Sequence, residues 1–191
     1  KTLVYYAIDR HYPKLKKAKN PALALLNAVM EKQTQLVINW MRVGFIHGVM
    51  NTDNITISGD TIDYGPCAFM DIYNPATVFS SIDLHGRYSY VNQPAIMHWN
   101  LLRFAETLLP LIHDKQAIAI KIAEDSINNF STLYKKNWLK MMRKKLGLYR
   151  EENEDESLIN NLLSWMEQNN INKGILLPET LNLIYYDTIE D

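Results

Sequence analysis

The chain has little cysteine, no long apolar run and almost no net charge, and each shortage excludes a class of protein. Cys67 is the only cysteine among 191 residues, so no intramolecular disulfide can form and a reducing compartment is expected. No segment approaches the ~20 consecutive apolar residues of a membrane-spanning helix. A net charge of −1 argues against binding to nucleic acid or to a membrane surface through bulk electrostatics.

The histidines do not form a metal-binding pattern either, because zinc sites need several His and Cys ligands at short spacings. They occupy scattered positions: His11, His47, His85, His98 and His113. What the chain does contain is 47% hydrophobic residues, enough for one domain with a substantial core. No repeat or low-complexity linker divides it, so we expect a single domain at 1–191 with an uncertain tail at 169–191.

Apolar residues recur at helical spacing over most of the chain and predict a mainly α fold with one small β-hairpin. The expected helices cover residues 2–11, 21–42, 94–111, 114–130, 131–146 and 155–168. Pro21 suits a first helical turn and Gly44 a helix end, while Asn92 and Asp114 are the expected N-caps of later helices. The inward faces of the helices at 94–111 and 155–168 are expected to carry Ile96, Trp99, Leu102 and Leu109, and Leu158, Ile159, Leu162 and Met166, respectively.

The stretch Gly44–Pro66, GFIHGVMNTDNITISGDTIDYGP, breaks this helical pattern. Two short β-like runs, 55–58 and 61–62, flank the dipeptide Gly59-Asp60. Such a dipeptide between apolar runs is a turn signal and predicts a β-hairpin.

Two carboxylates and an amide bracket this hairpin: Asp53, Asn54 and Asp63. Side chains at the two mouths of one hairpin can meet in space although they are distant in sequence. Oxygen ligands that meet in this way suit Mg²⁺, which takes one or two carboxylates and keeps water and phosphate oxygens. The alternative is a polar turn in which Asp53 and Asn54 cap backbone groups.

The spacing resembles the metal-binding half of a protein-kinase site. Kinase catalytic loops read H-R-D-x-x-x-x-N, and a D-F-G motif supplies the next metal ligand. His47 and Asn54 keep the His-to-Asn interval, and Asp63-Tyr64-Gly65 stands where Asp-Phe-Gly would. Val49 occupies the position of the kinase base and cannot accept a proton, whereas an acid occurs at Asp53.

Residues 66–93 show no strong period and carry many aromatic residues. An irregular stretch of this length in a compact domain is usually functional, and in a kinase-like lobe it corresponds to the activation segment and protein-substrate platform. The alternative is a loop held by packed aromatic side chains. Two interpretations of Arg87 in this stretch are open. Either it contacts an acceptor protein or positions the metal loop, or it forms an ordinary ion pair.

Two other features have plainer interpretations. In kinase-like loops the histidine equivalent to His47 braces the backbone, so a structural role is favoured over that of a general base. The basic run at 135–145 is followed by acidic residues at 151–156, which favours a solvated, self-neutralised surface over a phosphate-binding face.

Several motifs together resemble the selenoprotein O (SelO, YdiU) family, the pseudokinase-fold protein adenylyltransferases. The matching stretches are HGVMNTDN (47–54), TIDYGP (61–66), GRYSY (86–90), QP (93–94), WNLLRFAETLLPL (99–111) and KLGL (145–148). The match is close from Gly44 to Leu111 and looser on either side. Because independent motifs occur in the family's order, the resemblance is specific.

The resemblance implies a kinase-like C-lobe that takes part in transfer of AMP from ATP to Ser, Thr or Tyr hydroxyls of proteins. ATP is then bound in reverse orientation relative to kinases. Asp53 is the implied base, Asn54 and Asp63 the implied ligands of Mg²⁺ or Mn²⁺, and Asp63 also the implied contact to the metal-bound ATP. No Gly-rich loop or phosphate-binding lysine precedes the catalytic loop, so we expect a missing N-terminal lobe and an inactive fragment.

Two other hypotheses stay open at this point. One is a protein or small-molecule kinase with a displaced base. The other is an inactive fragment that serves as an interaction module through residues 66–93. The expected location is the cytoplasm for a bacterial protein and the mitochondrion for a eukaryotic one.

Overall fold

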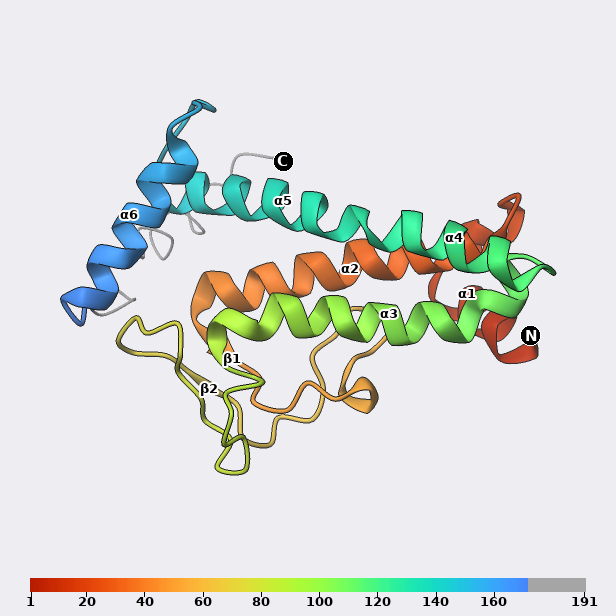
Figure 1. Ribbon diagram of the computed structural model, residues 1–191, viewed down its shortest axis with the longest axis horizontal. Coiled ribbons are helices and arrows are strands. Elements are labelled where there is room, and N and C mark those ends of the chain that lie inside the picture. Colours follow the sequence, from red (N-terminus) through yellow and green to blue (C-terminus); the bar gives the residue numbers. More distant parts are fainter. Residues whose placement is uncertain (172–191) are drawn as a thin grey trace, which may run out of the picture.

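The computed structural model describes residues 1–171 and is mainly helical with one two-stranded antiparallel sheet (Figure 1). The helices are α1 (Thr2–His11), α2 (Pro21–Val43), α3 (Gln93–Ile112), α4 (Gln116–Ile127), α5 (Asn129–Leu146) and α6 (Asp155–Gln168). The strands are β1 (Phe45–Ile46) and β2 (Ala68–Phe69), and short 3₁₀ turns occur at Pro13–Lys17 (η1), Thr52–Asn54 (η2) and Tyr90–Asn92 (η3). The predicted α class is confirmed, while the kinase-like C-lobe stays a prediction. Most of the tail 169–191 lies outside the described residues.

Helices α2 and α3 lie side by side at the centre of the molecule (Figure 1). α5 packs on α2 and α4 on α3, and the irregular segments between β1 and α3 lie on the other side of this pair. The shared core includes Leu25, Leu26, Met97, Leu101 and Leu108, each at most 1% exposed. Burial of one such side chain stabilises the fold by about 1.5–3 kcal/mol. Within residues 1–171, no helix is both long and apolar enough to cross a membrane.

The long helix α2 has the ends that its sequence predicts. Asn20 Oδ1 accepts a hydrogen bond from Leu23 N at 3.1 Å, and Pro21 stands in the first turn. Gly44 follows the last residue with a φ of 73°, a left-handed conformation that glycine adopts without strain. Asn20 Nδ2 also donates to Ile112 O at 2.8 Å, so the start of α2 is joined to the end of α3.

The predicted hairpin at 55–58 and 61–62 is wrong in extent. Only one antiparallel bridge, Ile55 to Thr61, occurs there. The Thr56 hydroxyl donates to Asp60 O at 2.8 Å and accepts from Asp60 N at 3.0 Å, a local turn that competes with a ladder. The carbonyls of Thr56 and Ile57 accept from Gln33 and Tyr12, so helix and N-terminal side chains replace the opposite strand.

Two predicted helix starts and one boundary also need correction. Asn92 precedes α3, but its side chain donates to Gly86 O at 2.8 Å and caps no helical N–H. Asp114 is not an N-cap, because α4 begins at Gln116 after Lys115. α4 ends at Ile127 and α5 begins at Asn129, slightly earlier than the periodicity predicts.

The predicted inward faces of α3 and α6 are partly wrong. Trp99 is 38% exposed and Leu158 is 51% exposed, whereas Ile96, Ile159 and Met166 are buried as predicted. The Trp99 ring is covered by the guanidinium groups of Arg87 and Arg103 at 5.0 and 5.5 Å. Cation–π contacts of this kind hold an aromatic ring at the surface.

Candidate functional site

The candidate site is a loop, residues 47–67, that leaves and returns to the same short sheet. Strand β1 precedes the loop and β2 follows it, with Phe45 paired to Phe69 and Ile46 to Ala68. The single bridge between Ile55 and Thr61 closes the loop a second time. This double closure fixes where the polar residues of the loop can lie.

Asn54 has the geometry of an oxygen donor. Its side chain is 9% exposed, and its Nδ2 atom donates to Val49 O at 3.0 Å. The amide nitrogen is therefore committed to the loop backbone. Among the described residues the Oδ1 atom makes no hydrogen bond, so it is the atom of Asn54 able to bind a cation.

Asp53 and Asp63 are both exposed and lie on opposite sides of the Ile55–Thr61 bridge. Each is two residues from the bridged pair, so the bridge holds the backbones that carry the two carboxylates near one another. Asp63 has a φ of 55°, a left-handed conformation uncommon for a residue with a side chain. Such residues occur often at ligand sites.

The donor set fits a magnesium-type cation that keeps other ligands. No group of three His, Cys, Asp or Glu side chains able to hold a metal is present within residues 1–171. The loop instead offers two carboxylates and one amide oxygen, Asp53, Asp63 and Asn54. Mg²⁺ is commonly held by one or two carboxylates and completed by water and phosphate oxygens, so this set suits a cation that arrives with a nucleotide.

His47 braces the loop, as its position in the motif predicts. Its side chain is fully buried. Nε2 lies 2.8 Å from Ile62 O, and Nδ1 accepts a hydrogen bond from Val49 N at 3.4 Å. The imidazole therefore ties the two arms of the loop together and is not presented to a substrate.

Two buried amides of α3 position the loop, and the sequence reasoning missed both. Gln93 is fully buried; its Oε1 accepts from His47 N at 3.0 Å and its Nε2 donates to Phe45 O at 2.9 Å. Asn100 is 4% exposed and donates to Met50 O at 3.0 Å. Each amide falls on an otherwise apolar helical face, and this pattern could have identified them. A buried amide almost always has a hydrogen-bond partner, so its presence on such a face indicates a polar contact to another element.

The irregular segment 66–93 combines packed and exposed aromatic residues. Tyr73 and Tyr90 are buried and meet edge to face with ring centroids 6.1 Å apart. Burial raises the pKa of Tyr73 to about 12 and that of Tyr90 well above its ordinary value, so both phenols keep their protons near neutral pH. Tyr90 Oη donates to Met41 O at 2.6 Å. Phe69, by contrast, is 63% exposed.

A further hydrogen bond joins this segment to the loop. Tyr88 Oη donates to Asn51 Oδ1 at 2.6 Å, and Asn51 lies two residues before Asp53. The bond connects the irregular segment to the part of the loop that carries the candidate carboxylate.

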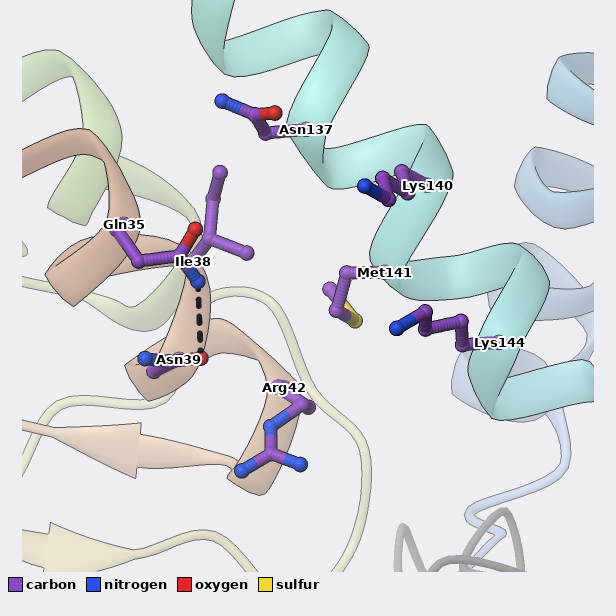
Figure 2. A pocket seen from close by; sticks show the side chains of 8 residues that line it. All are labelled: Gln35, Ile38, Asn39, Arg42, Asn137, Lys140, Met141 and Lys144. Atoms are coloured by element: carbon purple, nitrogen blue, oxygen red, sulfur yellow. Dashed lines mark hydrogen bonds between the residues drawn. The ribbon is translucent and has the colours of Figure 1, made fainter. Parts of the chain in front are cut away.

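The basic residues of α5 do not form one solvated face, because Lys145 is only 2% exposed and donates a hydrogen bond to Arg42 O at 2.5 Å. Lys135 pairs with Glu156 at 2.8 Å, and Arg143 pairs with Glu151 and Asp155, as a self-neutralised surface predicts. Lys140 and Lys144 instead line a cavity of about 360 Å³ between α2 and α5, where Figure 2 shows them across from the α2 side chains. This cavity is lined by Gln35, Ile38, Asn39, Arg42, Asn137, Lys140, Met141 and Lys144, none of them from the candidate loop.

Comparison with known proteins supplies the family of the chain. Residues 1–177 match the family model described as "Protein adenylyltransferase SelO". A protein nucleotidyltransferase YdiU of Clostridium botulinum is 56% identical over 191 residues, 100% of this chain and 38% of the relative. Proteins of the same name from Pelagibacter ubique and Alcanivorax borkumensis are 62% and 60% identical over 87% and 88% of this chain, and 34% and 35% of their own lengths. The chain thus spans just over a third of the length of these curated relatives.

Proposed function

Because the chain belongs to the SelO family of protein adenylyltransferases, we propose that it supplies the metal-binding and catalytic loop of an enzyme that transfers AMP from ATP to a protein hydroxyl. The observation that carries the proposal is the family match over residues 1–177. The family match also covers more of the chain than the motifs do, because the motifs match closely only over Gly44–Leu111. The arrangement of Asp53, Asn54 and Asp63 around one bridge supports it from the structure.

The proposed reaction needs a base beside the acceptor hydroxyl. The hydroxyl oxygen attacks the α-phosphorus of ATP and forms the new P–O bond, while the bond to the bridging α–β oxygen breaks and pyrophosphate leaves. Asp53 accepts the hydroxyl proton. Its exposure suits this task, because the acceptor belongs to another protein and has to reach the carboxylate.

Asp63 and Asn54 would hold the metal that accompanies the nucleotide. A bound Mg²⁺ or Mn²⁺ polarises the phosphate and stabilises the charge that develops on it. Asn54 supplies Oδ1 because its Nδ2 is held by Val49 O. Gln93, Asn100 and His47 hold the backbone of the loop in place, so that little reorganisation is needed when the nucleotide binds.

The label on ATP distinguishes this proposal from a kinase. The full-length protein that contains this chain is incubated with a protein acceptor and ATP labelled on either the α- or the γ-phosphate. We expect label in the acceptor only from α-labelled ATP, with pyrophosphate as the second product. Transfer of the γ-label alone would establish a kinase instead, and no transfer from either would favour an interaction module.

A further inference from the structure

Two aliphatic side chains stand exposed on the rim of a groove next to the candidate loop. Ile82 is 83% exposed and Leu84 is 85% exposed, the largest values of any valine, leucine or isoleucine among the described residues. Both line a groove of about 840 Å³ that runs between the irregular segment and the start of α3. Exposed apolar side chains gathered at a groove commonly mark an interaction site.

The turn that carries these side chains is held without them. The Asp83 carboxylate accepts hydrogen bonds from Arg87 N and Tyr88 N, both at 2.8 Å. Asn92 Nδ2 donates to Gly86 O at 2.8 Å and fixes the far side of the turn. Polar contacts therefore determine the shape of the turn, and neither Ile82 nor Leu84 is needed to maintain it.

The charged groups of the groove favour an acidic ligand. The Arg87 guanidinium lies 5.0 Å from the centre of the Trp99 ring and 5.7 Å from that of Tyr88. Within residues 1–171 it forms no ion pair, which contradicts the ordinary ion pair considered from the sequence. The lining carboxylate, Asp83, already has both oxygens hydrogen-bonded to backbone N–H groups. His85 also lines the groove and is exposed.

The groove is continuous with the candidate loop. Val49 and Asn51 form part of its wall, and Asn51 Oδ1 accepts the hydrogen bond of Tyr88 Oη at 2.6 Å. Asp53 is two residues farther along the chain, a span of at most ~7 Å. A peptide residue in the groove therefore lies within a few positions of a hydroxyl placed at Asp53.

We propose that this groove selects the acceptor. It binds an extended segment in which a large apolar residue, seated against Ile82 and Leu84, stands beside a carboxylate that faces Arg87, a few positions from the modified hydroxyl. The proposal rests on the proposed function for the identity of its occupant as an acceptor. The groove itself is defined by the described residues alone.

Binding of short fluorescent peptides to the full-length protein without ATP tests the groove directly. Three peptides share one acceptor serine and differ only at two adjacent positions a few residues from it, which carry leucine with aspartate, serine with aspartate, or leucine with lysine. We expect the first to bind at least about tenfold more tightly than either of the others, because it alone contacts both the apolar side chains and the arginine of the groove. Equal affinity for the three peptides would overturn the proposal.

Variants of the groove then assign the preference to its residues. Ile82→Ser with Leu84→Ser is expected to abolish the preference for leucine, and Arg87→Glu to reverse that for aspartate over lysine. The control, Leu3→Ser with Leu158→Ser, removes two other exposed leucines and is expected to bind all three peptides like wild type. Preferences unchanged by the groove variants would overturn the proposal.

Two further readouts separate peptide selection by the groove from AMP transfer and from a packing role of the same surface. A wild-type protein that shows these peptide preferences but transfers no α-phosphate label would overturn the proposed function and leave the groove standing. Thermal unfolding of the Ile82→Ser, Leu84→Ser variant of the full-length protein is expected to match wild type. A lower melting temperature together with unchanged peptide binding would show instead that Ile82 and Leu84 pack against another part of the full-length protein.

Discussion

At the scale of single residues, Asp53 and Asp63 flank one bridge but are assigned different tasks. In the full-length protein, Asp63→Ala is expected to abolish AMP transfer and to weaken ATP binding in the presence of Mg²⁺, because the proposed function makes Asp63 a metal ligand and such a ligand contributes to both. Asp53→Ala is expected to lower the transfer rate by roughly 10²–10⁴-fold and to leave nucleotide affinity nearly unchanged. Rates from α-labelled ATP and calorimetric titration measure the two effects.

The matched control for these variants is Asp60→Ala. Asp60 is an exposed carboxylate of the same loop whose backbone, rather than its side chain, bonds to Thr56. We expect wild-type transfer and affinity from it. Equal ATP affinity in wild type and the Asp63 variant would contradict the metal assignment.

Gln93 illustrates how much one buried amide contributes to the loop. Gln93→Met keeps the volume of the side chain but leaves His47 N and Phe45 O without their partner. Each unsatisfied buried group costs about 1–3 kcal/mol, so we expect the free energy of unfolding to fall by about 2–6 kcal/mol in chemical denaturation. Gln35→Met, an exposed amide of α2, should change it by no more than about 0.5 kcal/mol. A similar change in the free energy of unfolding from both variants would show that the hydrogen bonds of Gln93 contribute little to stability.

At the scale of elements, two glycines with positive φ should respond differently to alanine. Gly147 ends α5 with a φ of 69°, and a Cβ there would meet nothing within 4 Å. Gly48 has a φ of 84°, and a Cβ there would lie 2.9 Å from Pro66 Cγ and 3.2 Å from Pro66 O.

Gly147→Ala is therefore expected to cost about 1 kcal/mol from backbone conformation alone. Gly48→Ala should cost more, because the contact with Pro66 also pushes the two arms of the candidate loop apart. Thermal unfolding of both variants, with AMP transfer measured for the full-length protein, checks this expectation. Equal stability would mean that Pro66 moves away freely.

The contact between α5 and α6 through Asp155 should weaken in acid. Asp155 accepts hydrogen bonds from Glu152 N at 3.0 Å and Arg143 Nε at 2.5 Å, and these bonds lower the pKa of its carboxyl below the ordinary value of 3.8. Because the folded pKa lies below the unfolded one, the stabilisation is complete above about pH 4. It is lost as the pH falls through the folded pKa.

Melting temperature measured against pH tests this contact. Asp155→Asn should be less stable than wild type at neutral pH, and the difference should shrink below about pH 4. Glu151 is the exposed second partner of Arg143, and Glu151→Gln should have little effect, since exposed ion pairs contribute little to stability. If the profiles of wild type and Asp155→Asn stayed parallel into acid, the expectation would be contradicted.

At the scale of the whole molecule, this chain alone is expected to fold but to bind ATP weakly and transfer nothing detectable. The α2–α3 core is complete enough to support folding, whereas a few oxygen ligands do not replace a phosphate cradle and a lysine. The chain also exposes Tyr64 and Phe69 beside the sheet, 64% and 63% of their surfaces, a face suited to contact with another part of the protein. Calorimetric titration with ATP and Mg²⁺ is the measurement. Micromolar affinity, or labelling of an acceptor by this chain, would show that the nucleotide site is built differently.

The helices were predictable because their information is local. Apolar spacing and the signals at Pro21 and Gly44 depend only on neighbours in sequence; α6 has the predicted bounds, and α2 ends one residue beyond the predicted Arg42. The face of a helix was less predictable, since it depends on what packs against it. Trp99 carries an apolar ring in the expected register, yet two arginines cover it at the surface.

The order of the helices, the break at Gly44 and the spacing of His47, Asn54 and Asp63 that leads to the family all follow from local sequence. How the loop is held depends instead on long-range packing. Gln33 and Tyr12 reach it from other elements and bind the carbonyls of Thr56 and Ile57, which removes the partners that a hairpin ladder would need, while Gln93 accepts a hydrogen bond from His47 N at the start of the loop. Such contacts join residues far apart in the chain, and no local pattern specifies them, because a buried carbonyl accepts from whichever donor the packing of the helices brings to it.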